Sequence, residues 1–195
     1  GLCGSFNSNT FRRLESMKKE FQKEGKDVSV ITIGRKAKEY CKNRDINVDS
    51  EYTQMIPETM FETGKKISED VVQFYLNDFY DEVYMIYSKF VSAVEYNIQV
   101  EKLLPIEKKE GLSTKEYVFE PSEEEVLNSF VPQVLNIKLY QIGIENSASE
   151  HSARMSAMKQ ANDNASEMIR NLEVQYNRER QGKKTQELTE IISGS

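Results

Sequence analysis

The sequence predicts an α/β fold, with a small Rossmann-like sheet domain followed by one very long C-terminal α-helix. Two observations carry this prediction. Helical and strand-like patterns alternate over residues 1–120, as they do in layered α/β domains. After Pro132 no further proline occurs, and the only interior glycines of that region are Gly143 and Gly182. We therefore expect an α/β domain at residues 1–120 and a long helix at residues 121–195.

The first elements follow in order along the chain. A helix is expected near residues 8–24, because apolar residues share one face and Gly25 ends the pattern. The β-branched run DVSVITIG, residues 27–34, predicts a buried strand. The segments RKAKEYCKNR, residues 35–44, and ISEDVVQFYLNDF, residues 67–79, predict two further helices.

Two adjacent strand patterns close the α/β domain. DEVYMIYSKF, residues 81–90, and SAVEYNIQVEKLLPI, residues 92–106, are close enough to pair as a hairpin around residues 89–92. We expect a small, largely parallel sheet with an antiparallel edge. The charged, glycine-containing segment 106–118 is expected to form an exposed loop.

The long helix has a strong start signal at Ser122. The serine hydroxyl can cap the first turn, Glu125 stands three residues later as in a capping box, and residues 123–125 place negative charge at the helix N-terminus. Pro132 is expected to kink or restart the helix. A continuous helix of about 60 residues would span roughly 90 Å, so most of it must project from the α/β domain.

The stretch ASEHSARMSAMKQANDNASEMI, residues 148–169, is polar and rich in small residues. Its better packing positions nevertheless recur at steps that alternate between 3 and 4, which is the spacing of a coiled-coil seam. A seam requires a partner, and no other segment of the chain has a matching pattern. The predicted seam residues are Ala148, His151, Met155, Met158, Asn162, Ala165, Ile169 and Leu172.

Composition limits the classes of function. The net charge of −6 argues against a general nucleic-acid binder. No apolar run long enough for a membrane span is present, and no signal peptide opens the sequence.

Cys3 and Cys41 fit either a disulfide or two free thiols, and free thiols are favoured because no disulfide-rich pattern exists. The chain opens at Gly1 within a turn pattern, so we expect natural sequence to precede it.

No active-site pattern is recognisable. The single histidine, His151, rules out a multi-histidine metal site, and no CxxC pair is present. Neither a nucleophile elbow nor a nucleophile–base pair can be identified. The opening GLCGSFNSNTF, residues 1–11, has the glycine-rich turn that can bind phosphate before a helix, but it lacks GxGxxG and GK[ST]. We therefore predict no catalytic residue, no metal and no cofactor, and interpret residues 1–11 as a tight strand-to-helix turn.

The last segment, YNRERQGKKTQELTEIISGS, combines a basic cluster with an apolar end. A basic run is usually a solvated helix face. Here it lies near the tip of a projecting helix, and the apolar residues beyond it have no core in the chain to receive them. The combination indicates that the helix end enters a partner. The residues concerned are Arg178, Arg180, Lys183, Lys184, Leu188, Ile191 and Ile192.

These motifs resemble a known family. ENSASEHSARMSAMKQANDNASEMI followed by YNRERQGKKTQELTEIISG is similar to the C-terminal helix of the gamma subunit of F-type ATP synthases. GLCGSFNSN resembles the GLCG turn in the α/β domain of the same family. The two motifs bracket the chain, so the resemblance covers essentially all of it.

The resemblance implies a non-catalytic rotor shaft that couples proton-driven rotation to conformational change in catalytic beta subunits. The implied partners are the alpha and beta subunits of a hexamer, the epsilon subunit and a ring of c subunits. The implied location is peripheral, on the cytoplasmic face of the energy-transducing bacterial membrane. The family also pairs its long helix with an N-terminal helix in an antiparallel coiled coil, and that helix and the first strand are expected to be missing from this chain.

The resemblance also assigns partner-binding residues near the helix tip. Contacts to a catch loop of the beta subunit fall on the polar residues there, and the apolar end corresponds to a segment that turns in a bearing of the hexamer. These residues are Arg180, Gln181, Thr185, Gln186 and Glu187 for the catch, and Leu188, Ile191 and Ile192 for the bearing.

Two interpretations from other classes stay open. The first is a small Rossmann-like nucleotide-binding protein with a helical tail, which the absent glycine fingerprint opposes. The second is a coiled-coil scaffold with an α/β head that dimerises through residues 145–192. Co-purification with alpha and beta subunits is expected only of the rotor subunit.

Overall fold

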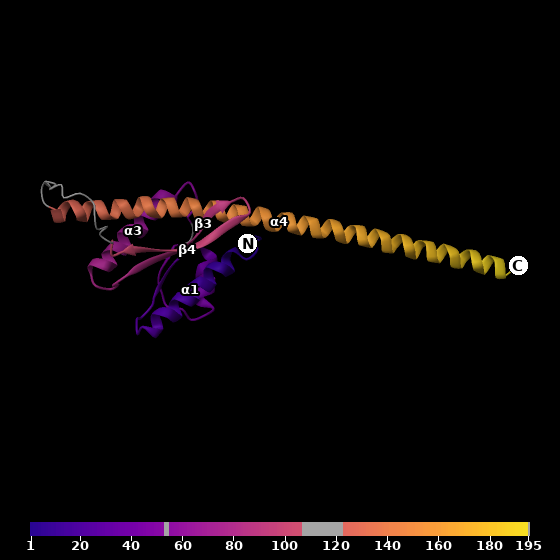
Figure 1. Cartoon of the computed structure of the whole chain (residues 1–195), viewed down its shortest axis with the longest axis horizontal. Helices are drawn as coiled ribbons and strands as arrows, with labels where there is room; N and C mark the ends of the chain where they lie inside the picture. Colours follow the sequence, from indigo (N-terminus) through magenta and orange to yellow (C-terminus); the bar gives the residue numbers. More distant parts are fainter. Residues whose placement is uncertain (53–54, 107–122, 195) are drawn as a thin grey trace.

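The computed structural model describes residues 1–52, 55–106 and 123–194 (Figure 1). An α/β part precedes one helix that first runs along it and then projects far beyond it. This arrangement confirms the predicted fold class. The elements are α1 (Phe6–Lys23), β1 (Val30–Ile33), α2 (Arg35–Lys42), β2 (Val48–Tyr52), α3 (Met60–Leu76), β3 (Val83–Ser92), β4 (Glu95–Leu104) and α4 (Glu123–Ser193).

The predicted helices and strands are present, with two notable differences. Helix α3 begins at Met60 rather than at residue 67, because Met60 and Gly64 are buried and extend its packed face toward the N-terminus. Strand β2 was not predicted at all. Its sequence, VDSEY, alternates half-buried and exposed residues and contains few apolar side chains, so its apolar signal is weak.

The strands form two separate pairs among the described residues rather than the single small sheet that was expected. β1 and β2 pair in parallel, and β3 and β4 pair antiparallel. The hairpin turn lies at Ala93 and Val94 rather than at residues 89–92, because Lys89 already pairs with Asn97 inside the ladder. The predicted loop at 106–118 lies outside the described residues except for Ile106, as does the predicted cap at Ser122.

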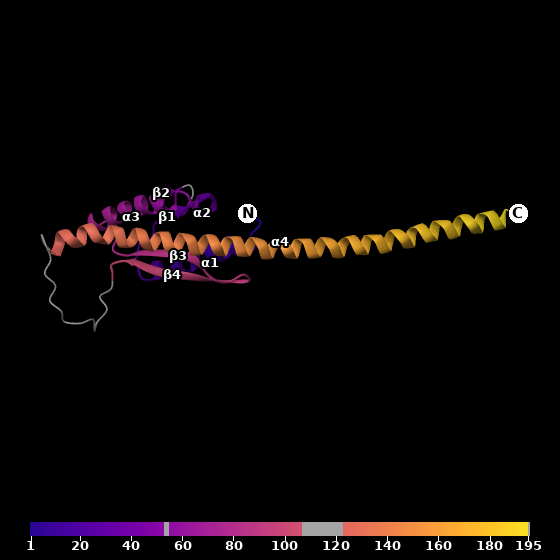
Figure 2. The ribbon, with the colours of Figure 1, turned by 90° about the horizontal axis from the view of Figure 1, so that it is seen from above.

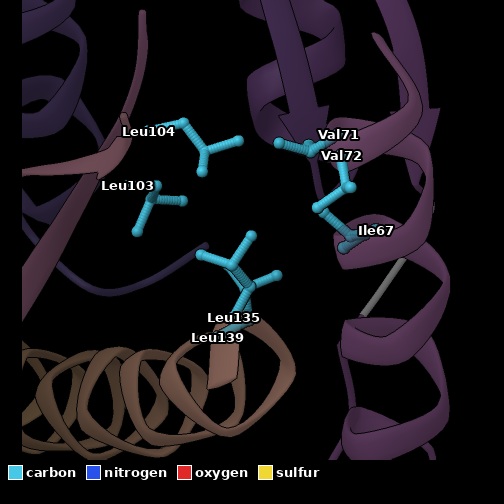
Figure 3. Close-up of a cluster of buried hydrophobic side chains, with 7 residues drawn as sticks. All are labelled: Ile67, Val71, Val72, Leu103, Leu104, Leu135 and Leu139. Carbon is cyan, nitrogen blue, oxygen red and sulfur yellow. The ribbon is translucent and has the colours of Figure 1, made fainter. Parts of the chain in front are cut away.

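The hydrophobic core lies where α3, β4 and the part of α4 around Leu135 and Leu139 meet (Figure 3). Each element contributes aliphatic side chains that are at most 8% exposed. Burial of one such side chain is worth about 1.5–3 kcal/mol, so this part of α4 is integral to the core. The seven core residues are Ile67, Val71, Val72, Leu103, Leu104, Leu135 and Leu139.

Helix α4 lies between α3 on one side and the β3–β4 hairpin on the other (Figure 2). The approach to α3 is close because Gly64 has no side chain. A Cβ atom at Gly64 would lie 2.8 Å from Oδ1 of Asn136 in α4. The glycine therefore permits the backbones of the two helices to come together.

Helix α4 contains 71 residues, which corresponds to a length of about 105 Å. Pro132 lies inside the helix and does not end it. From Met158 onward every described side chain except Ser166 is exposed. The described helices, α4 included, contain no stretch that is both long and apolar enough to cross a membrane.

Candidate functional site

Helix α4 presents two different sides along its middle turns. Leu135, Leu139 and Ile142 point into the core and are 2–4% exposed. Successive residues of an α-helix are rotated by about 100°, so Met155 and Met158 fall on the side opposite these leucines. The predicted seam therefore faces away from the α/β part.

The large apolar residues of the predicted seam are exposed. Met155, Met158, Ile169 and Leu172 have exposed fractions of 58%, 48%, 58% and 57%. Soluble monomers rarely expose long contiguous apolar patches, so this stripe is a candidate interaction surface. Of the remaining seam residues, Ala148 is half-buried, and His151, Asn162 and Ala165 are exposed.

The stripe extends further toward the N-terminus of α4 than the sequence analysis predicted. Phe130, Ile137 and Ile144 are 57%, 62% and 47% exposed. They stand at intervals of 7, and the same interval continues to His151 and Met158. The heptad spacing was visible in the sequence. It was missed because this region also supplies core residues, and spacing alone does not say which apolar side meets the core.

The predicted tip residues are all exposed on the last turns of α4. Gln181, Thr185, Leu188 and Ile192 follow an i, i+4, i+7, i+11 pattern and so share one narrow face. The Thr185 hydroxyl donates to the Gln181 carbonyl oxygen at 2.9 Å, within the helix. Arg180, Glu187 and Ile191 lie on an adjacent face. Nothing in the described chain covers this end.

The two motifs that carry the family resemblance meet in space. Arg154 Nε donates to the Gly1 carbonyl oxygen at 3.3 Å. A Cβ at Gly4, whose φ is +58°, would lie 3.8 Å from the Ala157 Cβ. Cys3 is buried in this turn, and both it and Cys41 are free thiols. The GLCG turn thus packs against α4, as a structural turn does.

Two hydrogen bonds between a tyrosine and an aspartate connect parts of the α/β region. Tyr52 donates a hydrogen bond to Asp70, joining β2 to α3, and Tyr80 donates one to Asp49 at 2.6 Å. Burial and the Asp49 carboxylate raise the pKa of Tyr80 to about 12. These Tyr–Asp pairs tie β2 to α3 and to the segment that follows α3.

The described residues offer no evident site for chemistry. No group of three His, Cys, Asp or Glu within the described part of the chain is arranged to hold a metal ion. A shallow hollow lies on the free part of α4, where a single helix cannot enclose a ligand. Its lining residues are Asn164, Glu167, Met168, Asn171, Leu172 and Gln175.

Comparison with known proteins agrees with this geometry. The family model described as ATP synthase matches residues 1–195. The chain is 43% identical over 195 residues to the ATP synthase gamma chain of Fusobacterium nucleatum, covering all of this chain and 68% of that one. It is 40% identical over 198 residues to the ATP synthase gamma chain of Geotalea daltonii, covering all of this chain and 69% of the relative.

Solved structures give the same result. A chain of the central stalk and c-ring of the Tetrahymena thermophila mitochondrial ATP synthase matches with a TM-score of 0.67 and 25% identity, over 83% of this chain and 71% of that chain. A chain of the Euglena gracilis mitochondrial ATP synthase shares the fold, with a TM-score of 0.71 and 18% identity, over 99% of this chain and 67% of that chain.

An α/β part with a single long projecting helix, matched by the ATP synthase model over the whole chain, defines a subunit of the ATP synthase class. The chain belongs to the family of ATP synthase gamma chains, the non-catalytic central-stalk subunits of the rotor. This membership confirms the predicted family and function. It also sets aside the nucleotide-binding protein and the free-standing scaffold.

Proposed function

We propose that α4 is the drive shaft that carries rotation between the c-ring and the catalytic hexamer of alpha and beta subunits. In this proposal residues 1–120 form the base of the rotor, beside the epsilon subunit and the c-ring, and residues 121–195 form the shaft. The observation that carries it is the exposed length of α4 beyond Ala157 in a chain of the gamma family. Most of the stability of a protein helix comes from packing, so partners are expected around a helix that is exposed over this length.

The exposed seam is the surface on which a second helix of the assembled subunit packs. Its heptad spacing, small residues and position opposite the core suit an antiparallel coiled coil. The family resemblance assigns the second helix to the N-terminal segment of the subunit. Packing along the seam would stiffen the shaft against bending and twisting.

The tip residues are proposed to contact the hexamer. Arg180 and Gln181 would bind polar groups of a beta-subunit catch loop, with Thr185, Gln186 and Glu187 beside them. Leu188, Ile191 and Ile192, which are 60–76% exposed, would turn within an apolar bearing. Contacts made at some rotor angles and lost at others would link the shaft orientation to the state of one beta subunit.

The proposed location is peripheral, at the cytoplasmic face of a bacterial energy-transducing membrane. The named relatives are bacterial, and the described helices include no membrane-crossing stretch. Attachment would then come through the c-ring.

Reconstitution tests the proposal. The complete subunit that contains this chain is mixed with alpha and beta subunits and fractionated by size. We expect it to co-elute with them and to support ATP hydrolysis. Replacing Leu188, Ile191 and Ile192 together by Glu should reduce recovery of the complex, whereas replacing Ser166 by Ala should not. A subunit that elutes alone, with hydrolysis unaffected by its presence, would refute the proposal.

A further inference from the structure

The contact between α4 and the α/β part changes character where the helix leaves it. Ile142, 2% exposed, is the last buried aliphatic residue of α4. Beyond it the contact is made by small and polar side chains, and Ser149 is the one that is completely buried. It meets Ser88 of β3, which is also completely buried. The exit point of the shaft is therefore built from polar groups rather than from aliphatic packing.

Ser88 is bonded through its backbone to two side chains of α4. Its N–H donates to Oδ1 of Asn146 at 3.1 Å, and its carbonyl oxygen accepts from the Ser149 hydroxyl at 3.0 Å. The Ser149 hydroxyl also lies 2.8 Å from the Glu145 carbonyl oxygen, the usual intrahelical acceptor for serine. β4 occupies one edge of β3, and the side chains of α4 satisfy the other edge at this position.

A second point of attachment lies at the hairpin turn. The Ser152 hydroxyl reaches the carbonyl oxygens of Ala93 at 2.5 Å and Ser92 at 3.4 Å. Asn146, Ser149 and Ser152 therefore hold one hairpin to successive turns of α4 at two separate places. We call these three residues the hairpin latch.

Directional bonds add to the resistance that core packing already offers to rotation of α4. A side chain extends about 5 Å from the helix axis, so a rotation of roughly 20° would move its end by about 2 Å. Such a displacement exceeds the range of N–H···O and O–H···O hydrogen-bond distances. The latch thus selects one rotational setting of α4 relative to the hairpin.

We infer that the hairpin latch fixes the rotational setting of the shaft and carries torque between the α/β part and the projecting helix. This inference rests on the proposed function of α4 as a drive shaft. Ser149, Asn146 and Ser152 act as positioning residues in it and touch no nucleotide. The latch lies near the point where α4 leaves the α/β part, and the contacts of Arg154 and Ala157 with the GLCG turn lie just beyond it. A twisting load on the projecting helix would pass through this region.

The test replaces Asn146, Ser149 and Ser152 by Ala in the complete subunit, within the assembled membrane enzyme. A double replacement of Ser147 and Ser156 by Ala is the matched control, because neither hydroxyl bonds to a described residue. Ser147 lies on the same turn as Asn146 and Ser149, and Ser156 lies one turn beyond Ser152. ATP hydrolysis is measured without load, in the presence of an uncoupler. Protons pumped per ATP are then measured against a gradient. Hydrogen exchange at the Ser88 amide reports whether the latch has opened.

Each lost hydrogen bond shifts an equilibrium roughly fivefold. We expect unloaded hydrolysis within about twofold of the unmodified enzyme, and protons pumped per ATP against the gradient reduced by about threefold or more. The control should match the unmodified enzyme in both measurements. Should the triple variant fail to assemble, Ser152→Ala alone, at the more accessible hairpin turn, is expected to show a smaller loss under load.

The possible outcomes distinguish a failure of the latch inference from a failure of the drive-shaft proposal. Faster exchange at Ser88 with an unchanged pumping ratio would overturn the inference, because the bonds would then satisfy a strand edge and carry no torque. An unmodified subunit that assembles but never supports pumping would overturn the drive-shaft proposal itself. A loss under load in the triple variant that is absent from the Ser147 and Ser156 control supports the latch.

Discussion

Gly143 of α4 lies directly against Met60 of α3. A Cβ atom at Gly143 would stand 2.7 Å from the Met60 sulfur and 3.1 Å from its Cγ. Met60 is 1% exposed, so it has little room to move aside. Glycine is unfavourable in the middle of a helix, but here it is required because α3 and α4 cross at Gly143.

The close contact between Gly143 and Met60 predicts that replacing glycine by alanine has opposite effects on stability at Gly143 and at Gly182. Gly143→Ala gains helix propensity but forces Met60 off its position, and overpacking of this kind costs about 1–3 kcal/mol. We expect a net loss in the free energy of unfolding. Gly182→Ala, where a Cβ meets nothing within 4 Å, should gain up to about 1 kcal/mol. Denaturant titration of both variants measures the difference, and a gain of equal size at both sites would contradict the predicted crossing.

An ion-pair network predicts a pH dependence of stability. Hydrogen bonds from Lys102 and then Lys26 lower the pKa of Glu82 to about 2. Because the folded-state pKa lies below the ordinary value of 4.5, the ionised carboxylate contributes stability above about pH 4.5. That contribution is lost as the pH falls toward 2. The effect is small, since all three groups are solvent-accessible.

The measurement compares Glu82→Gln with the parent chain. The variant should be less stable near neutral pH, and the difference should shrink as the pH falls below 4.5. Glu69→Gln is the matched control, since Glu69 is exposed in the middle of α3 and forms no ion pair with a described residue. A stability difference for Glu82→Gln that stays constant down to pH 3 would argue against the network.

The sequence predicted the long helix well because its signal is local. The long C-terminal run has only one interior proline and two interior glycines, and this pattern favours a helix without reference to the rest of the fold. Strand β2 was not predicted, because VDSEY has little strand signal of its own and forms a strand by pairing with β1. The separation of β1–β2 from β3–β4 likewise depends on long-range contacts that no local pattern records.

The same distinction between local patterns and long-range contacts applies to the candidate site. The seam from Ala148 to Leu172 was predicted because heptad spacing is a property of one helix. Its continuation through Phe130 and Ile137 was not predicted, since Leu135 and Leu139 on the other side are equally apolar. The hydrogen bond between Ser149 and Ser88 joins residues 61 positions apart, and serines carry no sequence signal for such a bond.

The exposed seam predicts the behaviour of the isolated chain. A helix draws most of its stability from packing, so α4 should either pair with α4 of a second copy or fray beyond about residue 150. Light scattering measures the mass, and hydrogen exchange measures protection along residues 150–190. Replacing Ile169 and Leu172 by Glu should abolish any self-association, whereas Glu173→Gln should leave it unchanged. A strict monomer with full amide protection over residues 150–190 would contradict this prediction.

The last prediction concerns the tip. Arg180 carries a planar, permanently charged fork suited to a carboxylate, and Gln181 can donate and accept beside it. If these side chains grip a beta-subunit loop at particular rotor angles, Arg180→Ala removes a charge-assisted bond worth roughly 1.5–3 kcal/mol. That energy corresponds to a change on the order of ten- to a hundredfold in an equilibrium between rotor states.

The experiment places Arg180→Ala and Gln181→Ala separately in the complete subunit and measures ATP hydrolysis and proton-driven synthesis. Assembly should survive or weaken modestly, because Leu188, Ile191 and Ile192 remain, while turnover falls in both directions. Arg170→Ala, an exposed arginine on the same helix but away from the tip, is the control and should leave both rates unchanged. If Arg180→Ala and Gln181→Ala behave like Arg170→Ala, the tip side chains are passive surface. Torque would then reach the beta subunits through the apolar end of α4 and the body of the shaft.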